Sequence, residues 1–169
     1  MGDVHVMERT LVLLKPDAVQ RALSGRIIQR FEDVGLKIIG MKMVQASREH
    51  ATEHYADVGV RRGAKILEQN VNFLQEGPVI ALVLEGIQSI ELVRKMVGST
   101  ESKAASPGTI RGDFSHQSYA YADAQNQVIK NLIHASSSSE DAKKEIALWF
   151  NEKELYSYKS VHERHTFGK

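Results

Sequence analysis

The chain has 169 residues, 42% of them hydrophobic, and a formal net charge of +1; we therefore expect one domain over residues 1–169, with a C-terminal arm from about residue 151. The small net charge argues against a dedicated nucleic-acid site, and no apolar run reaches the ~18 residues of a membrane span. The chain has no cysteine, which excludes a disulfide framework or a thiolate metal site and fits a cytoplasmic location.

The first part of the chain predicts two strands with a helical stretch between them. Thr10–Lys15 is a short apolar run that ends at a proline, which is typical of a buried strand. Pro16 to Gly35 carries a helical apolar stripe, interrupted near its middle. Lys37–Gln45 alternates apolar residues, Met41 and Met43 among them, with polar or small ones, which predicts a second strand with one apolar side.

A helical excursion follows. Ser47–Val58 is predicted to be helical and carries Tyr55, Gly59–Gly63 is predicted to be a basic turn, and Ala64–Gln75 has a second helical stripe. Pro78–Leu84 is an apolar run typical of a third strand.

The second half begins with a predicted helix at Ser89–Val97 and a long loop at Gly98–Asp113 that has almost nothing to bury. Phe114–Ala122 is predicted to be a strand or an extended edge. Val128–Ile133 is predicted to be the fourth core strand, and Glu140–Phe150 a helix capped by Ser138 or Ser139.

This order of elements predicts an α+β fold. Two split-βαβ units make a ferredoxin-like sandwich, a four-stranded antiparallel sheet covered by helices that we expect on one face. A doubly wound parallel sheet is the alternative, which the order of elements alone does not exclude.

The stretch from Asn131 to Glu145 holds the best candidates for chemistry. His134 ends an apolar run, and Glu145 lies on the apolar stripe of the helix that follows. A carboxylate on a buried face needs a hydrogen-bond donor, which an imidazole N–H supplies. We therefore expect His134 to be a nucleophile or base and Glu145 to orient it.

Cations from three separate elements complete this candidate site. Lys15 ends the first strand, Arg94 adjoins the inner face of a helix, and Arg111 lies in the long loop. Cations that converge on a histidine suit phosphoryl transfer, because the charge on the phosphoryl oxygens must be neutralised. Neither standard phosphate-loop motif, GxxxxGK[ST] or GxGxxG, is present.

From Glu8 to about Tyr158 the chain resembles the nucleoside diphosphate kinase family. The matching pieces are ERTLVLLKPDAVQR, the Tyr55 segment, GPVIALVLEG, RKMVGST, SPGTIRGDF, NLIHAS and EIALWF. The pairing of TIRGDF with NxxHxS is the most specific of them.

The resemblance implies an enzyme that passes the γ-phosphate of a nucleoside triphosphate to a nucleoside diphosphate through a phosphohistidine. It makes His134 the nucleophile, Glu145 its carboxylate partner, and Ser136 a hydrogen-bonding neighbour. It assigns phosphate and sugar contacts to Lys15, Tyr55, Arg94, Thr100, Arg111 and Asn131. It also implies Mg²⁺ held mainly by the nucleotide phosphates, with few direct protein ligands and no metal-binding residue assigned, and a homo-hexamer or homo-tetramer.

The chain departs from the family pattern in three places. The aromatic residue that contacts the base is replaced by Ile66 or Leu67, and Ser137 stands where an aspartate is usual. Extra residues lie within Ser115–Lys130. Two other functions are therefore weighed against the kinase: a non-catalytic nucleotide-binding module and a protein-histidine phosphotransfer partner.

Overall fold

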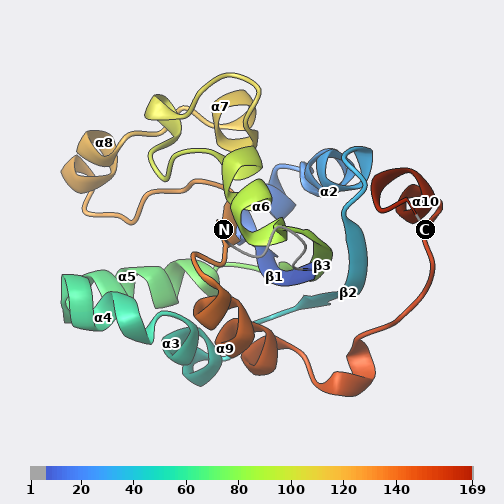
Figure 1. The fold of residues 1–169 in the computed structure, drawn as a ribbon. Coiled ribbons are helices and arrows are strands. Elements are labelled where there is room, and N and C mark those ends of the chain that lie inside the picture. Colours follow the sequence, from blue (N-terminus) through green and yellow to red (C-terminus); the bar gives the residue numbers. More distant parts are fainter. Residues whose placement is uncertain (1–6, 169) are drawn as a thin grey trace.

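The structure, a computed structural model, describes residues 7–168. Within them, four strands form one sheet in the order β2-β3-β1-β4, and each neighbouring pair is antiparallel (Figure 1). The strands are β1 (Met7–Leu14), β2 (Lys37–Val44), β3 (Val79–Ile87) and β4 (Ile133–Ala135). This arrangement confirms the ferredoxin-like sandwich and excludes the parallel sheet.

The helices agree with the sequence pattern most closely where an apolar stripe is long. Those predicted at residues 64–75, 89–97 and 140–150 lie within one residue of the observed bounds. The helices are α1 (Pro16–Gln20), α2 (Ser24–Asp33), α3 (Arg48–His54), α4 (Ala56–Arg62), α5 (Ala64–Leu74), α6 (Ser89–Val97), α7 (Ile110–Phe114), α8 (Tyr119–Ala124), α9 (Ser139–Trp149) and α10 (Val161–Thr166), with 3-10 turns η1 (Ser102–Ala104) and η2 (Glu152–Glu154). Between residues 7 and 168, no helix is both long and apolar enough to cross a bilayer.

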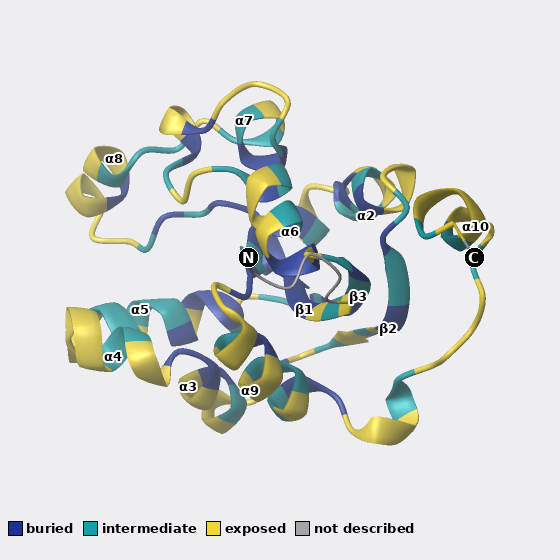
Figure 2. Ribbon diagram, viewed as in Figure 1, coloured by how far each residue is buried: buried dark blue, intermediate teal, exposed yellow. Residues whose placement is uncertain are grey.

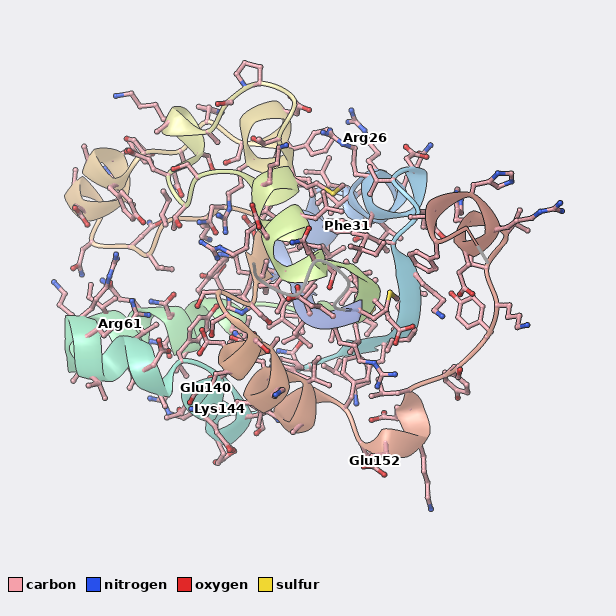
Figure 3. All side chains as sticks on the ribbon, viewed as in Figure 1. Arg26, Phe31, Arg61, Glu140, Lys144 and Glu152 are labelled. Carbon is pink, nitrogen blue, oxygen red and sulfur yellow. The ribbon has the colours of Figure 1, made fainter. Side chains whose placement is uncertain are left out.

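Helices cover both faces of the sheet. Val12 and Leu14 of β1 belong to a core cluster with residues of α1, α2 and α6, and Phe31 of α2 points into it (Figure 3). Leu11 and Leu13 belong to a second cluster with α3, α5 and α9. Strands β1 and β3 are mostly buried between these layers, whereas the edge strand β2 is more exposed (Figure 2). The expectation of helices on one face is wrong, because the excursion between β2 and β3, together with α9, adds a second layer.

A bulge in β2 overturns the expectation that Met41 and Met43 lie on its apolar side. The pairing with β3 shifts between Ile38 and Gly40. The extra residue reverses which alternate side chains face each core. Ile39 is therefore 2% exposed, whereas Met41 and Met43 are 59% and 58% exposed.

Two predicted loop or strand segments are mostly helical instead. Gly59–Gly63, expected to be a basic turn, is helical up to Arg62 as the end of α4. Phe114–Ala122, expected to be extended, contains most of α8. Ser118 starts α8 by accepting a hydrogen bond from the Tyr121 N–H at 3.2 Å. The alternation of tyrosine with alanine imitates a strand period, so the cap was the better signal.

The fourth strand is shorter than predicted and begins later. Of the expected Val128–Ile133 strand, only Ile133 belongs to β4. Leu132 has φ of 72°, which breaks the extended run. The loop Gly98–Asp113 also buries more than expected, since Ser102, Ile110 and Arg111 lie inside.

The described part of the C-terminal arm packs along the edge strand β2. The Tyr156 N–H donates to the Ile39 carbonyl at 2.7 Å, and the Tyr158 hydroxyl donates to the Ile38 carbonyl at 2.8 Å. Residue 169 and residues 1–6 of the expected domain lie outside the described part.

Candidate active site

Strand β4 determines where the His134 side chain points. His134 is paired with Leu13 of β1, and side chains alternate between the faces of a strand. The ring therefore lies on the face covered by α3, α5 and α9. Ser138 caps the start of helix α9, since its hydroxyl accepts the Asp141 N–H at 3.0 Å. This start places Glu145 on the side of α9 that faces His134.

A chain of hydrogen bonds fixes the His134 ring. Its Nε2 lies 2.8 Å from Oε1 of Glu145, and the Ser136 hydroxyl donates to Oε2 of Glu145 at 2.6 Å. The Leu11 N–H of β1 in turn donates to the Ser136 oxygen at 3.1 Å. Because the carboxylate accepts the Nε2 proton, the lone pair of His134 lies on Nδ1.

A second imidazole, His54 at the end of α3, packs against the first. The two ring centroids lie 4.6 Å apart at an interplanar angle of 82°. Trp149 Nε1 donates to His54 Nδ1 at 3.2 Å, so the proton of a neutral His54 lies on Nε2. Burial lowers the pKa of His54 well below its usual value, and the neighbouring His134 lowers it further. His54 therefore remains neutral beside His134.

His54, His134 and Glu145 also resemble a metal site, since each offers a donor atom within 4.8 Å of the others. Their hydrogen bonds argue against that reading. Glu145 is bonded to His134, and the acceptor nitrogen of His54 is bonded to Trp149. A metal would have to displace these contacts, so the cluster is better described as a set that orients His134.

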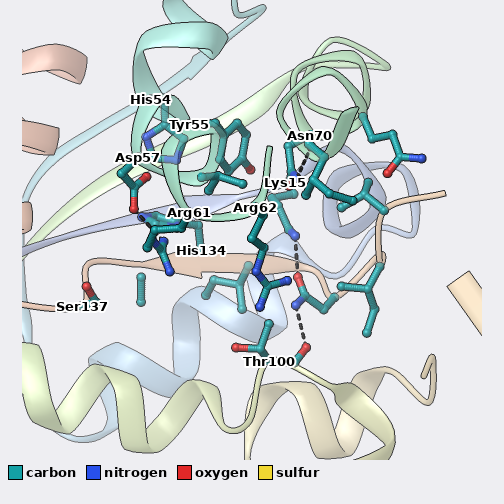
Figure 4. Close-up of a pocket in the computed structure, with 18 of the residues that line it drawn as sticks. Lys15, His54, Tyr55, Asp57, Arg61, Arg62, Asn70, Thr100, His134 and Ser137 are labelled. Carbon is teal, nitrogen blue, oxygen red and sulfur yellow. Dashed lines mark hydrogen bonds and ion pairs between the residues drawn. The ribbon is translucent and has the colours of Figure 1, made fainter. Parts of the chain in front are cut away.

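The predicted site residues meet at one cavity of about 1120 Å³ (Figure 4). Among the residues that line it are His134, Glu145, Lys15, Tyr55, Ile66, Arg94, Thr100, Arg111 and Asn131. Ser136 is fully buried behind Glu145. The cavity thus brings the residue after β1, the junction of α3 and α4, and parts of α5, α6, α7, β4 and α9 to one place.

Lys15 and Asn131 connect the two sides of this cavity. The Lys15 ammonium donates to Oδ1 of Asn131, and Nδ2 of Asn131 donates to the Thr100 carbonyl at 2.7 Å (Figure 4). Next to them, the strained Leu132 is held by its N–H, which donates to Asp17 at 2.9 Å. Its carbonyl accepts from the Lys15 N–H at 2.8 Å. Strain held by its surroundings is common at functional sites.

The buried cations make the cavity a receptor for anions. Burial lowers the pKa of Lys15 to about 8; Asp17 opposes this shift, and the positive charge of Arg111 contributes to it. Burial likewise lowers the pKa of Arg111 to about 10, with Arg94 as a second cause. Positive charge confined in this way is stabilised when an anion binds.

Arg111 also holds the surrounding backbone. Its guanidinium donates to the carbonyl oxygens of Asn131 at 3.2 Å, Gly98 at 2.9 Å and Ile133 at 2.6 Å. The side chain therefore fixes the loop before α7 to β4, in addition to placing charge at the cavity.

Four residues at the site were missed by the sequence reasoning. His54, Arg61, Arg62 and Tyr119 also line the cavity. Arg61 and Arg62 were assigned to a turn and Tyr119 to an extended segment. None of these three residues was therefore expected to face a ligand. Two basic residues in the last turn of a helix, and a serine cap before Tyr119, were signals that could have found them.

A histidine fixed by a carboxylate and facing buried cations in a cavity of this size defines a phosphotransferase site. Comparison with known proteins agrees with this class. The chain belongs to the nucleoside diphosphate kinase family, whose model matches residues 8–155.

Relatives match over most of their length. A nucleoside diphosphate kinase of Pyrococcus furiosus is 47% identical over 155 residues, which cover 92% of this chain and 90% of the relative. One of Borreliella burgdorferi is 42% identical over 156 residues, 91% of this chain and 93% of the relative. These similarities confirm the resemblance found in the motifs.

Solved structures match the fold as well. A transition state mimic of the Borrelia burgdorferi enzyme with bound vanadate and ADP has a TM-score of 0.92 at 41% identity, covering 95% of this chain and 97% of that one. A Halobacterium salinarum nucleoside diphosphate kinase in complex with CDP has a TM-score of 0.82 at 36% identity, covering 95% and 99%.

Proposed function

We propose that this nucleoside diphosphate kinase transfers the γ-phosphate of a nucleoside triphosphate to a nucleoside diphosphate through a phosphorylated His134. One observation carries the proposal: Glu145 engages Nε2 of His134 at 2.8 Å, which places the lone pair on Nδ1 in a cavity lined by cations. An oriented imidazole of this kind is a suitable nucleophile.

The first half of the reaction forms phosphohistidine. Nδ1 attacks the γ-phosphorus, the bond to the β–γ bridging oxygen breaks, and the nucleoside diphosphate leaves with the electron pair. Glu145 accepts a hydrogen bond from Nε2–H and stabilises the positive ring. In the second half, a terminal oxygen of another nucleoside diphosphate attacks the phosphorus, and Nδ1 recovers its lone pair.

The remaining residues bind the nucleotide in this proposal. Lys15, Arg94 and Arg111 neutralise the phosphate oxygens, which is the main requirement of phosphoryl transfer. Tyr55, Thr100 and Asn131 line the cavity beside them and are assigned to phosphate and sugar, and Ile66 to the base.

Mg²⁺ would be held mainly by the nucleotide phosphates and would neutralise their charge. Three of the five carboxylates that line the cavity are already engaged by other side chains, which supports this assignment. Asp57 is paired with Arg61 at 2.6 Å, Glu145 is bonded to His134, and Asp141 accepts from Ser137. Asp141 and Ser137 are the oxygen donors closest in role to the family's aspartate, and Mg²⁺ usually retains several waters.

We expect the enzyme to accept several bases, since the assigned contacts are to phosphate and sugar. Its relatives were solved with ADP and with CDP. Assembly as a homo-hexamer or homo-tetramer and a cytoplasmic location stay predictions.

The decisive test is phosphate exchange. Incubation with ATP and GDP should yield GTP, which neither a nucleotide-binding module nor a protein phosphotransfer partner would produce. His134→Ala should abolish both GTP formation and acid-labile labelling from radioactive ATP. His116→Ala, at an exposed histidine outside the cavity, is the matched control and should behave as the wild type. Wild-type labelling of His134→Ala would assign the nucleophile elsewhere.

A further inference from the structure

The cavity extends beyond the cations into a region between two helical walls. One wall comes from α4 and α5 and includes Arg62 and Ile66. The other comes from α8 and the segment before β4 and includes Tyr119, Ala122 and Val128. Figure 1 shows α8 facing the α4–α5 pair across this region. Its lining includes the aromatic ring of Tyr119 and the aliphatic side chains of Ile66 and Val128.

Tyr119 and Arg62 face one another across this region. The Arg62 guanidinium lies 6.0 Å from the centroid of the Tyr119 ring. A flat base in contact with a group on each side needs about 7 Å between them, twice a carbon–carbon contact distance of ~3.5 Å. Arg62 is exposed and its side chain is long, so a shift of about 1 Å admits a base.

The ring of Tyr119 is carried by a fixed helix. The Tyr119 N–H donates to Glu101 at 3.0 Å, and Ser118 caps the helix. A further hydrogen bond joins the two walls, since the Gln69 side chain of α5 donates to the Asn126 carbonyl at 2.9 Å. The wall is thus in place before a ligand binds, which reduces the ordering cost of binding.

We propose that Tyr119 and Arg62 form the nucleobase subsite and stack the base between an aromatic ring and a guanidinium plane. Both groups stack on bases of any kind. A purine presents the larger π-face, so this subsite binds purine nucleotides more tightly than pyrimidine nucleotides. The inference rests on the proposed function, because it takes the ligand to be a nucleotide.

The proposal also gives a role to the extra segment Ser115–Lys130. Ile66, on the opposite wall, offers the base only aliphatic contact. Tyr119 supplies a flat face from that extra segment instead. Specificity at this end of the cavity then depends on residues far in sequence from the phosphate-binding cations.

The test compares Tyr119 with its neighbour on the same helix. Tyr119→Ala should raise the KM for GDP by about 5- to 150-fold, the range measured for loss of a base–aromatic stack. The rise in KM for UDP should be smaller, and kcat should stay close to the wild-type value. Tyr119→Phe should keep the wild-type KM, since the ring remains. Arg62→Ala should change KM in the same direction as Tyr119→Ala.

Tyr121→Ala is the matched control. Tyr121 is 58% exposed and does not line the cavity, so its loss should leave both KM values unchanged. An unchanged KM for GDP in a folded Tyr119→Ala variant would overturn the base subsite while exchange activity stands. The opposite outcome is also distinguishable. If the wild type shows no exchange activity, but calorimetry shows that it binds ADP and that Tyr119→Ala weakens this binding, the kinase proposal is overturned and the base subsite stands.

Discussion

Lys15 shows how one residue combines a cost to stability with a binding role. It is 6% exposed, and burial lowers its pKa to about 8 from 10.5. The folded protein therefore holds a cation where an uncharged group would be more stable. An anionic ligand would supply the compensating charge, in agreement with the phosphate contact proposed for this residue.

The depressed pKa predicts a pH dependence of nucleotide binding. Above pH 8 Lys15 of the free enzyme loses its proton, so ADP binding must take one up and its affinity should fall by up to about tenfold per pH unit. Calorimetry of ADP binding over this range measures the change. Lys15→Met should bind weakly and without this alkaline decline. An equal decline in both proteins would assign it to another group.

The same group predicts that removing the charge stabilises the fold. Between pH 8 and 10.5 the unfolded chain binds more protons at Lys15 than the folded one, so stability rises with pH through this window. The destabilisation is fully present below it. At neutral pH, Lys15→Met should therefore raise the free energy of unfolding by about 1–3 kcal/mol. This is a net value, from which the lost hydrogen bond to Asn131 has already been subtracted.

Urea unfolding of Lys15→Met and wild type at neutral and alkaline pH tests this. The difference should shrink as the pH rises. A variant less stable than the wild type at neutral pH would show that the hydrogen bond to Asn131 outweighs desolvation.

At the scale of elements, α9 carries the group that orients His134. Glu145 reaches His134 because the helix is capped at Ser138, and the chain offers a run of serines from Ser136 to Ser139. Sequence alone left Ser138 and Ser139 as equal caps. The structure assigns the cap to Ser138, because its hydroxyl accepts the Asp141 N–H at 3.0 Å.

Replacing each of the two serines in turn by alanine tests which of them caps the helix. Ser138→Ala should lower the free energy of unfolding by about 1 kcal/mol, as is typical for loss of an N-cap, and should reduce turnover by loosening Glu145. Ser139→Ala, in the first turn, is the control and should change neither. Thermal unfolding and the exchange assay measure both effects, and equal losses in the two variants would contradict the assigned cap.

At the scale of the whole molecule, the edge strand β2 is only partly covered. The C-terminal arm pairs with Ile39, whereas Met41 and Met43 are more than half exposed. Exposed apolar side chains on an edge strand mark a contact surface or an aggregation hazard. We expect a second copy of the chain to cover them.

Light scattering of Met41→Lys/Met43→Lys tests this expectation. The double variant should show a lower mass in solution than the wild type, because buried lysines disfavour the contact. Val60→Lys on α4, where the native side chain is 88% exposed, should leave the mass unchanged. A double variant with the wild-type mass would place the subunit contact elsewhere.

The sequence by itself determined the features that depend on local periodicity. Apolar stripes predicted α5, α6 and α9, apolar runs predicted β1 and β3, and an alternating pattern predicted β2. The residue types also indicated that Lys15, Arg94 and Arg111 would gather around His134. These signals are local because each helix or strand repeats its pattern over a few residues. The family resemblance added the roles that local patterns could not supply.

Only the tertiary structure decided the features that depend on contacts between distant residues. The bulge in β2 reversed the orientation of Met41 and Met43, and the left-handed Leu132 shortened β4. Lys15 and Asn131, 116 positions apart in sequence, meet only because β1 and β4 pair. The opposition of Tyr119 and Arg62 likewise arises from two helical walls that no short sequence window contains. Free energy from long-range packing overrode local preference at each of these positions.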